Sequence, residues 1–86
     1  MKYGIELAKG AESDLEYLFS ADRKLCTRLF ARLETLASDP FQGKPHVGNH
    51  KGEYSLRVGN YRIVYEPDAV KHIAYILTVK HRKHVY

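Results

Sequence analysis

The sequence predicts an α+β fold, in which a small twisted, antiparallel-rich sheet packs against two helices. Three observations support this prediction. Residues 53–66 have the pattern of a β-hairpin, residues 9–39 contain two stretches of helical periodicity, and residues 72–80 are rich in β-branched and aromatic side chains. The expected order is an N-terminal strand, two helices and then three C-terminal strands. With 86 residues, the chain has room for a single domain, residues 1–86.

The N-terminal segment opens with a short strand that leads into a helix. Residues 3–7 alternate between apolar and polar side chains, which predicts a strand that turns Tyr3, Ile5 and Leu7 inward. Residues 9–18 are rich in helix formers and carry apolar side chains at helical spacing, with acidic side chains outward. We therefore expect a short first helix with one face on the sheet.

The second helix has the clearest periodicity in the chain. Ser20 is its expected N-cap, and the helix should end at Asp39 because the residue before a proline is disfavoured in the helical region. Its outward side carries Lys24, Arg28 and Arg32 at every fourth position; this row either contacts phosphate or is simply solvated. The apolar stripe consists of Leu25, Cys26, Leu29, Phe30, Leu33, Leu36 and Ala37.

The hairpin is centred on Gly59-Asn60, where glycine at the first turn position favours a type II′ turn. A two-residue loop pairs Arg57 with Arg62. Like charges directly opposite one another destabilise a sheet by roughly 0.2–1 kcal/mol, so the pair suggests an anion between the two arginines. The alternative is a solvated strand face with two splayed arginines. This register turns Tyr54, Leu56, Val58, Tyr61, Ile63 and Tyr65 to the core and Ser55, Arg57, Arg62 and Val64 to the other side.

The segments around the hairpin read as a loop, a turn and a buried strand. Residues 41–51 contain glycines, a proline and two histidines, which predicts a loop. Pro67-Asp68 predicts a turn. In residues 72–80 both alternate sets are largely apolar, as expected for a strand near the middle of a sheet.

The basic charge is concentrated in the C-terminal half. The chain carries 14 Lys and Arg against 10 Asp and Glu, a net charge of +4. Residues 1–50 are balanced, so the whole excess lies in residues 51–86, and all five histidines lie from His46 onward. This asymmetry predicts a polyanionic partner that meets the C-terminal half.

Composition also excludes several classes of protein. With 44% hydrophobic and 28% charged residues, the chain is expected to fold rather than remain disordered. It has no apolar run long enough to span a membrane and no signal-peptide pattern, so we expect a soluble cytoplasmic protein without a membrane partner. The one cysteine, Cys26, excludes an internal disulfide, and its apolar helical setting predicts a buried thiol.

Residues 80–86 form a basic tail that ends in a tyrosine. We expect the hairpin to lie beside the last strand and so to bring Arg57, Arg62 and the tail to one concave, phosphate-binding face. The alternative is a tail that only solvates the chain end.

Two other kinds of site are weaker alternatives. His46 and His50 are four residues apart and His81 and His84 three apart, but neither pair has a cysteine or carboxylate framework, so we expect no metal. Four tyrosines offer rings for base stacking, although their inward parity favours core packing. They are Tyr54, Tyr61, Tyr65 and Tyr75.

Three motifs carry a family resemblance that covers the whole chain. They are Leu-Ala-Ser-Asp-Pro at 36–40, Leu-Arg-Val-Gly-Asn-Tyr-Arg-Ile-Val-Tyr at 56–65 and Val-Lys-His-Arg-Lys-His-Val-Tyr at 79–86. Together they resemble the RelE toxins of bacterial and archaeal toxin–antitoxin systems. The resemblance implies a RelE-like fold and a ribosome-dependent mRNA interferase that cuts messenger in the A site without a cofactor. It also implies a RelB-like antitoxin, acidic and partly disordered when free, as a partner besides the ribosome and mRNA.

The resemblance assigns roles to individual residues. The family's hairpin arginine falls on Arg62, its last-strand arginine on Arg82 and its C-terminal tyrosine on Tyr86, all three catalytic. His81 is a further catalytic candidate and Glu53 an alternative base, because other relatives use His or Glu in this cleft. Some relatives carry lysines on the first hairpin strand where this chain has Glu53 and a serine. The implied RNA-binding residues are Lys51, Ser55, Arg57, Lys80 and Lys83.

The chemistry requires three functions of these residues. The ribose 2′-OH must lose its proton, the charge of the phosphorane must be stabilised, and the leaving 5′ oxygen must be protonated. Arginine suits the second function because its planar fork matches phosphate and stays charged. A tyrosine has an unperturbed pKa of about 10, and neighbouring cations would lower the pKa of Tyr86 toward the working range of a base.

Two other functions stay open. The same fold occurs in ParE-like toxins, which inhibit DNA gyrase by binding protein and have no nuclease site. A catalytically inactive nucleic-acid-binding module would also account for the basic half. The presence of Arg62, Arg82 and Tyr86 in matching places favours the nuclease.

Overall fold

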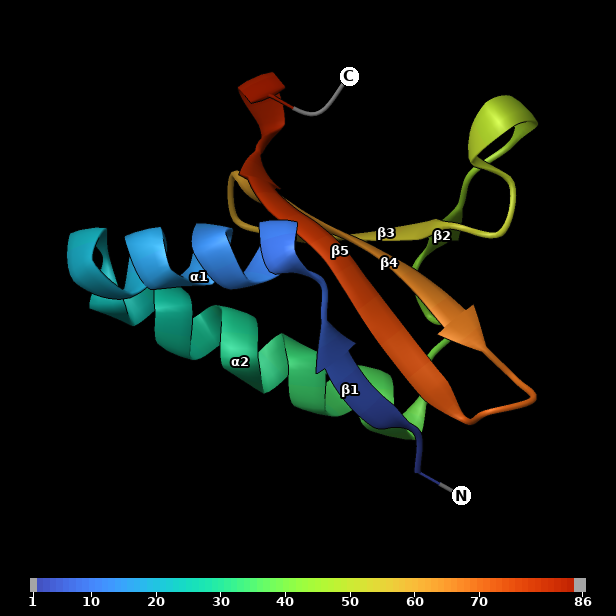
Figure 1. Cartoon of the computed structure of the whole chain (residues 1–86). Helices are drawn as coiled ribbons and strands as arrows, with labels where there is room; N and C mark the ends of the chain where they lie inside the picture. Colours follow the sequence, from blue (N-terminus) through green and yellow to red (C-terminus); the bar gives the residue numbers. More distant parts are fainter. Residues whose placement is uncertain (1, 85–86) are drawn as a thin grey trace.

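The computed structural model describes residues 2–84, and this part of the chain has the predicted α+β architecture (Figure 1). Two helices pack on one face of a sheet with the strand order β1-β5-β4-β3-β2, in which β1 is parallel to β5 and the other neighbours are antiparallel. The elements are β1 (Gly4–Leu7), α1 (Lys9–Ala21), α2 (Arg23–Ser38), β2 (Lys44–Pro45), η1 (Gly48–His50), β3 (Tyr54–Val58), β4 (Tyr61–Asp68), β5 (Ile73–His81) and η2 (Arg82–His84). Neither α1 nor α2 is long and apolar enough to cross a membrane.

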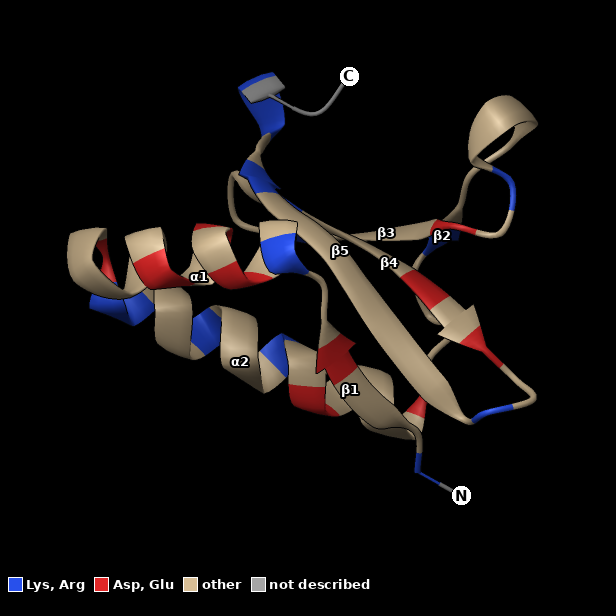
Figure 2. Ribbon diagram, in the orientation of Figure 1, with Lys and Arg blue, Asp and Glu red and all other residues tan. Residues whose placement is uncertain are grey.

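The junction between the helices differs from the prediction. Helix α1 continues through Ser20, so Ser20 is not the N-cap of α2. Asp22 is the cap instead: its backbone is extended, with φ of −154°, and its carboxylate accepts a hydrogen bond from the Leu25 N–H at 3.0 Å. Both residue types suit a cap, and only the extended backbone at position 22 separates them. Helix α2 ends before Asp39, as predicted. The acidic side of α1 and the basic row of α2 are visible in Figure 2.

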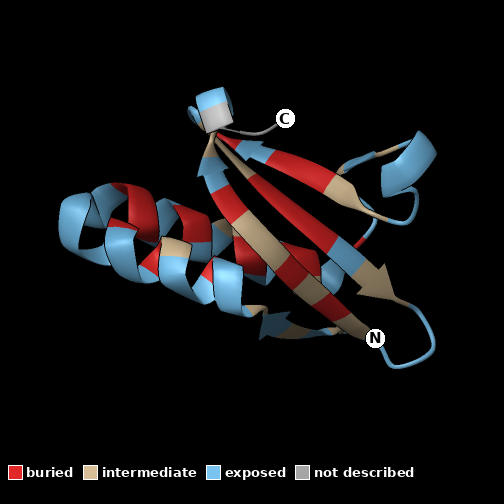
Figure 3. Ribbon diagram, turned by 45° about the horizontal axis from the view of Figure 1, so that its top comes forward, coloured by how far each residue is buried: buried red, intermediate tan, exposed pale blue. Residues whose placement is uncertain are grey.

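The core lies between the helices and the sheet (Figure 3). Most of the predicted inward residues are buried or partly buried, but two are exposed. Phe30 is 46% exposed because it lies at the margin of the apolar stripe, and Leu7 is 37% exposed because it ends the edge strand β1. Together with Phe19, they line a shallow apolar groove of about 290 Å³. The largest fully buried side chains are Tyr65, Leu29, Leu36, Ile63 and Ile76.

The hairpin has the predicted register, with Arg57 opposite Arg62 and Val58 opposite Tyr61. Gly59 has a positive φ of 60° and Asn60 does not, which is the pattern of a type II′ turn. The outward face is more covered than expected, because Ser55 is only 8% exposed and Val64 is buried as well.

Two connecting segments are more ordered than the sequence suggested. Within the expected loop 41–51, β2 pairs with β3 and η1 forms a single turn. The N–H of Gly43 donates to the Tyr65 hydroxyl at 2.9 Å, and a Cβ at position 43 would lie 2.6 Å from that oxygen, so only glycine fits. Strand β4 runs on through the expected turn at Pro67. Because β3 begins at Tyr54, which pairs with Tyr65, no residue of β3 lies opposite Pro67 to need the proline's missing N–H.

The final strand, β5, pairs on both sides, as predicted for a strand inside the sheet. Its register against β4 shifts by one residue at Leu77, so that Thr78 faces Val64 but Ile76 faces Tyr65. This bulge keeps the apolar side chains of β5 on the helix side at both ends of the strand.

Candidate functional site

The sheet face opposite the helices, here called the open face, carries a row of three cations. Arg57 lies opposite Arg62, and Arg62 lies opposite Lys80 on β5. Since alternate residues of a strand point to opposite faces, the predicted pairing of the two arginines places both on the open face. The basic residues at the end of β5 and on η2 lie at the same end of the sheet as the hairpin turn (Figures 1 and 2).

Arg62 lines a cavity of about 320 Å³ together with Ser55 and with residues of the preceding segment. We call it the His–Arg cleft; its lining comprises Lys44, Pro45, His46, Val47, His50, Ser55 and Arg62. Arg62 was expected to be catalytic and Ser55 to bind RNA, whereas Lys44 and the two histidines were not assigned to this surface. The cleft exists because the segment before β3 folds back on the sheet: the His46 N–H donates to the Glu53 carbonyl at 2.8 Å.

The side chain of Glu53 lies between the two histidines of the cleft. Its Oε1 is 3.8 Å from Nδ1 of His46 and 3.5 Å from Nδ1 of His50. The two imidazole rings meet edge to face, with their centroids 6.1 Å apart. A carboxylate beside an imidazole orients the ring. The cleft therefore contains two groups that can transfer protons, together with an arginine. General acid–base catalysis uses groups of this kind.

The sequence contained an indication of this cluster, but that indication suggested metal binding and not proton transfer. The four-residue spacing of His46 and His50 was weighed only as a metal site, and Glu53 was named on its own as an alternative base. Among residues 2–84, no group of three or more His, Cys, Asp or Glu side chains has a geometry that could hold a metal ion. The fold-back that joins the three residues depends on pairing with β3, and no spacing rule reports that pairing.

The end of β5 does not bring all the predicted residues together. His81 lies opposite Tyr61, one position beyond the Arg62–Lys80 pair, and its ring packs edge to face on the Tyr61 ring at 5.3 Å. It therefore has the parity of the helix side and lines a different cavity, of about 440 Å³, with Asp14 among the lining residues. The expectation of one concave face holding the whole set is wrong for His81, because neighbouring residues of a strand point to opposite faces.

Of the other predicted residues, Lys80 and Lys83 line the same cavity as His81. The Arg82 N–H donates to the Asn60 carbonyl at 2.8 Å, which ties the start of η2 to the hairpin turn. Lys80 forms an ion pair with Asp14 on α1 at 2.8 Å. Lys51 and Lys83 are exposed. Tyr86 lies outside the described residues, and so does the side chain of His84.

The tyrosines and the basic row of α2 also have defined surroundings. Tyr65 is fully buried, and Tyr54 and Tyr61 pack against the core, which supports their structural role. The inward parity expected of Tyr75 is wrong, because Tyr75 lies opposite Glu66 on the other face of the sheet and lines a surface cavity. Burial raises the pKa of the Tyr65 phenol, against the opposing effect of the Gly43 hydrogen bond. In the basic row, Arg28 reaches the hairpin, with its guanidinium about 3.6 Å from a Cβ built on Gly59.

Comparisons with known proteins agree with this architecture. The RelBE2 toxin–antitoxin complex of Mycobacterium tuberculosis contains a chain that is 29% identical, with a TM-score of 0.79 over 95% of this chain and 100% of that one. A YoeB/ParE toxin from Agrobacterium tumefaciens is 17% identical, with a TM-score of 0.82 over 91% of this chain and 96% of that one. The RelE–RelB complex of Pyrococcus horikoshii contains a chain that is 21% identical, with a TM-score of 0.76 over 99% and 100%.

Sequence comparison identifies the family. A search of curated protein sequences gave no match. The family model for the ParE toxin of the type II toxin–antitoxin system parDE, however, matches residues 5–86, which is nearly the whole chain. This chain therefore belongs to the ParE toxin family of type II toxin–antitoxin systems, within the wider RelE/ParE superfamily of toxins.

Proposed function

We propose that this toxin is a ribosome-dependent mRNA interferase. The observation that carries the proposal is the His–Arg cleft, where Arg62 lies in one cavity with His46 and His50, and both histidines face Glu53. A toxin that acts only by binding a protein needs no proton-transfer groups beside a phosphate-binding arginine. A metal-independent ribonuclease needs both.

The groups of the cleft suit the three steps of RNA cleavage. One imidazole, in its neutral form, accepts the proton of the ribose 2′-OH while the 2′ oxygen attacks phosphorus. Arg62 stabilises the charge that develops on the phosphoryl oxygens. The other imidazole, as imidazolium, donates its proton to the 5′ oxygen as that P–O bond breaks, which leaves a 2′,3′-cyclic phosphate and a 5′-hydroxyl. Glu53 lies next to both rings and orients them.

Other basic residues contribute binding to this reaction. Lys44 and Ser55 line the cleft, Arg57 stands beside it in the hairpin, and Lys51 is exposed nearby in sequence. Phosphate contacts of this kind fix the position of an RNA strand without reading its sequence. Arg82 keeps the catalytic role that the RelE resemblance implies, and the ribosome places the messenger against it. Tyr86 is the alternative acceptor of the 2′-OH proton.

We also propose that a cognate antitoxin silences the toxin. The related chains from Mycobacterium tuberculosis and Pyrococcus horikoshii were solved in toxin–antitoxin complexes. A RelB-like partner with an acidic segment that orders on binding would complement the basic C-terminal half of this chain. Since its targets are ribosomes, the toxin acts in the cytoplasm.

Gyrase inhibition is the second candidate, because the matching family model is named for ParE. Expression in cells separates the two functions. The interferase proposal predicts arrest of translation with cleaved messages, and Arg62→Ala should lower the cleavage by roughly tenfold to a thousandfold while its circular dichroism stays unchanged. Induction of DNA-damage signalling with intact messages would instead establish gyrase inhibition. Absence of any toxicity would indicate a binding module.

A further inference from the structure

The edge of β5 changes its partner halfway along the strand. Strand β1 pairs with β5 only as far as Ile76, and the Ala8 N–H then donates to the Ile76 carbonyl at 2.9 Å as the chain turns into α1. From Leu77 to His81, helix α1 takes the place of a strand along this edge. An exposed edge presents unpaired N–H and C=O groups, so the groups of β5 here need partners from the helix.

The contacts that helix α1 makes along this edge have the same spacing on the helix as on the strand. Gly10 packs against the Leu77 carbonyl, 3.2 Å from the position of a Cβ, and Asp14 bonds the N–H of Val79. Four helical residues rise about 6.0 Å, and two strand residues rise about 6.6 Å. The rise from Gly10 to Asp14 along the helix therefore nearly equals the rise from Leu77 to Val79 along the strand. This match explains why the small residue and the hydrogen-bond acceptor are one helical turn apart.

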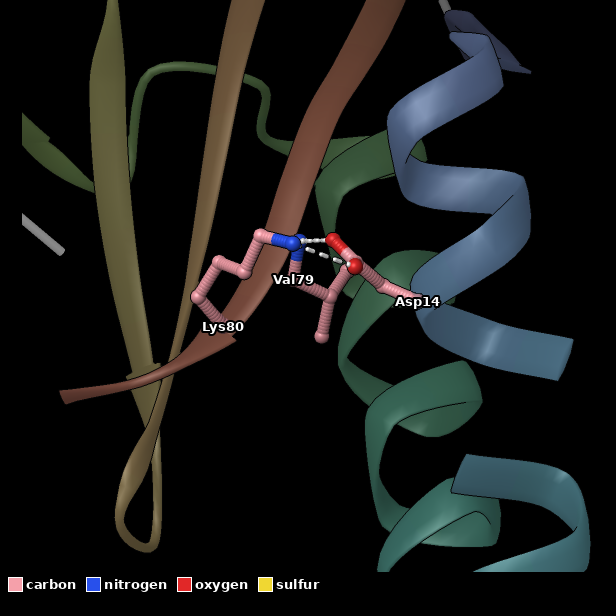
Figure 4. Close-up of polar contacts among 3 residues, drawn as sticks. All are labelled: Asp14, Val79 and Lys80. Carbon is pink, nitrogen blue, oxygen red and sulfur yellow. Dashed lines mark hydrogen bonds and ion pairs between the residues drawn. The ribbon is translucent and has the colours of Figure 1, made fainter. Parts of the chain in front are cut away.

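Asp14 makes two bonds with one carboxylate (Figure 4). Its Oδ2 accepts from the Val79 N–H at 2.9 Å, and its Oδ1 accepts from Nζ of Lys80 at 2.8 Å. The Asp14 side chain is only 11% exposed. The backbone bond occupies the edge of β5, while the ion pair draws the ammonium of Lys80 to α1, although Lys80 follows Arg62 in the row of the open face.

The same short segment is held from its other side by the hairpin. The Arg82 N–H donates to the Asn60 carbonyl at 2.8 Å. Residues 79–82 thus lie between α1 on one side and the hairpin on the other, where β4 also pairs with Val79, Lys80 and His81. Loss of the Asp14 bond therefore leaves the backbone of this segment tied on the hairpin side only.

We propose that Asp14 is a positioning residue, which fixes the end of β5 and thereby the placement of Arg82, and which also keeps Lys80 away from RNA. The first part concerns the fold of this chain alone. Its consequence for cleavage rests on the proposed interferase function. Asp14 touches neither RNA nor reacting atoms in this scheme, since it acts through the backbone of Val79.

Three variants separate the backbone bond from the charge. Asp14→Ala removes both interactions. Asp14→Asn keeps an oxygen acceptor for the Val79 N–H but releases Lys80. Glu16→Ala is the matched control, since Glu16 is an exposed acid on the same helix and its removal changes the net charge as the other two substitutions do.

Amide hydrogen exchange of the full-length toxin tests the positioning directly and needs no activity. In Asp14→Ala, the Val79 and Arg82 amides should exchange about tenfold faster or more, while amides of the fully buried β4 residues keep their protection. Asp14→Asn and Glu16→Ala should both stay close to wild type. Unchanged exchange of Arg82 in a folded Asp14→Ala would overturn the proposal.

Kinetics on programmed ribosomes test the consequence. Asp14→Ala should lower the cleavage rate at saturating toxin by roughly tenfold or more, without weaker ribosome binding, and Asp14→Asn should restore most of the rate. Both variants should bind RNA with a salt slope steeper by about one unit, because a cation is released from its partner. Equal loss of rate in the two would refute positioning. A wild-type toxin that does not cleave would refute the interferase function, and hydrogen exchange would still decide the role of Asp14.

Discussion

Arg62 and Arg57 face each other across the hairpin, but only Arg62 lines the His–Arg cleft. We predict that Arg62→Ala lowers message cleavage by roughly tenfold to a thousandfold, in keeping with the loss of one charge-stabilising donor. Arg57→Ala removes the same charge from an exposed position and should cost about threefold or less, as expected for one solvated phosphate contact. Cleavage rates on ribosomes measure both effects, with circular dichroism as the check on folding. Equal losses would mean that the cleft does not define the site.

The histidines of the cleft account for proton transfer in our scheme. His46→Gln and His50→Gln should each lower cleavage by about a hundredfold or more, because a general acid or base contributes roughly 10²–10⁴ in rate. The pH–rate profile should change from a bell to a single-sided curve in either variant. Tyr86→Phe is the comparison: if it alone causes the hundredfold loss, the 2′-OH proton goes to the terminal tyrosine, as the family resemblance implied.

Among the structural elements, the junction of α1 and α2 offers a clean test of capping. Asp22→Ala removes the acceptor of the Leu25 N–H and should lower the free energy of unfolding by about 1 kcal/mol, within the range of roughly 0.5–2 for lost N-caps. Ser20→Ala, inside α1, should change it by less than about 0.5 kcal/mol. Urea unfolding of the two variants measures the difference. A larger cost for Ser20→Ala would contradict the helix boundary seen here.

Local patterns predicted the helices and strands more accurately than the contacts between them. The hairpin register followed from the turn residues and the two-residue period, and the end of α2 followed from Pro40, because these signals act over a few residues. Ser20 and Asp22 are both good caps, so sequence could not choose between them. The two-residue period, applied to β5 as well, would have placed His81 on the face opposite to Arg62, because Lys80 is the residue that pairs with Arg62.

Contacts that depend on how the elements pack together were out of reach of such patterns. Glu53 meets His46 only because the preceding segment folds back on β3, and Asp14 meets Val79 across 65 positions of the chain. Neither residue type is unusual where it stands in the sequence. The sequence therefore shows each residue of the cleft, but only the three-dimensional structure shows that these residues lie together.

At the scale of the whole molecule, two buried acids predict how stability depends on pH. Burial raises the pKa of Cys26 above its ordinary 9.0 and that of Tyr65 above its ordinary 10.0. Above these values the unfolded chain loses protons that the folded chain retains, so the free energy of unfolding falls as pH rises. Each group contributes a slope of at most about 1.4 kcal/mol per pH unit. Unfolding at pH 8 and at pH 10.5 measures the fall, and Tyr65→Phe should show a shallower one. An identical fall in that variant would contradict the assignment.

The central claim is that this toxin cuts messenger RNA on the ribosome through the His–Arg cleft. Mapping of message ends in purified translating ribosomes, with wild-type toxin and with folded Arg62→Ala, tests it most directly. We predict new ends within the codon of the ribosomal A site, carrying a 2′,3′-cyclic phosphate upstream and a 5′-hydroxyl downstream. They should form only when ribosomes are present and should be at least about tenfold fewer with the variant than with the wild type. Intact messages with wild-type toxin, or equal cleavage by the Arg62→Ala variant, would contradict the account.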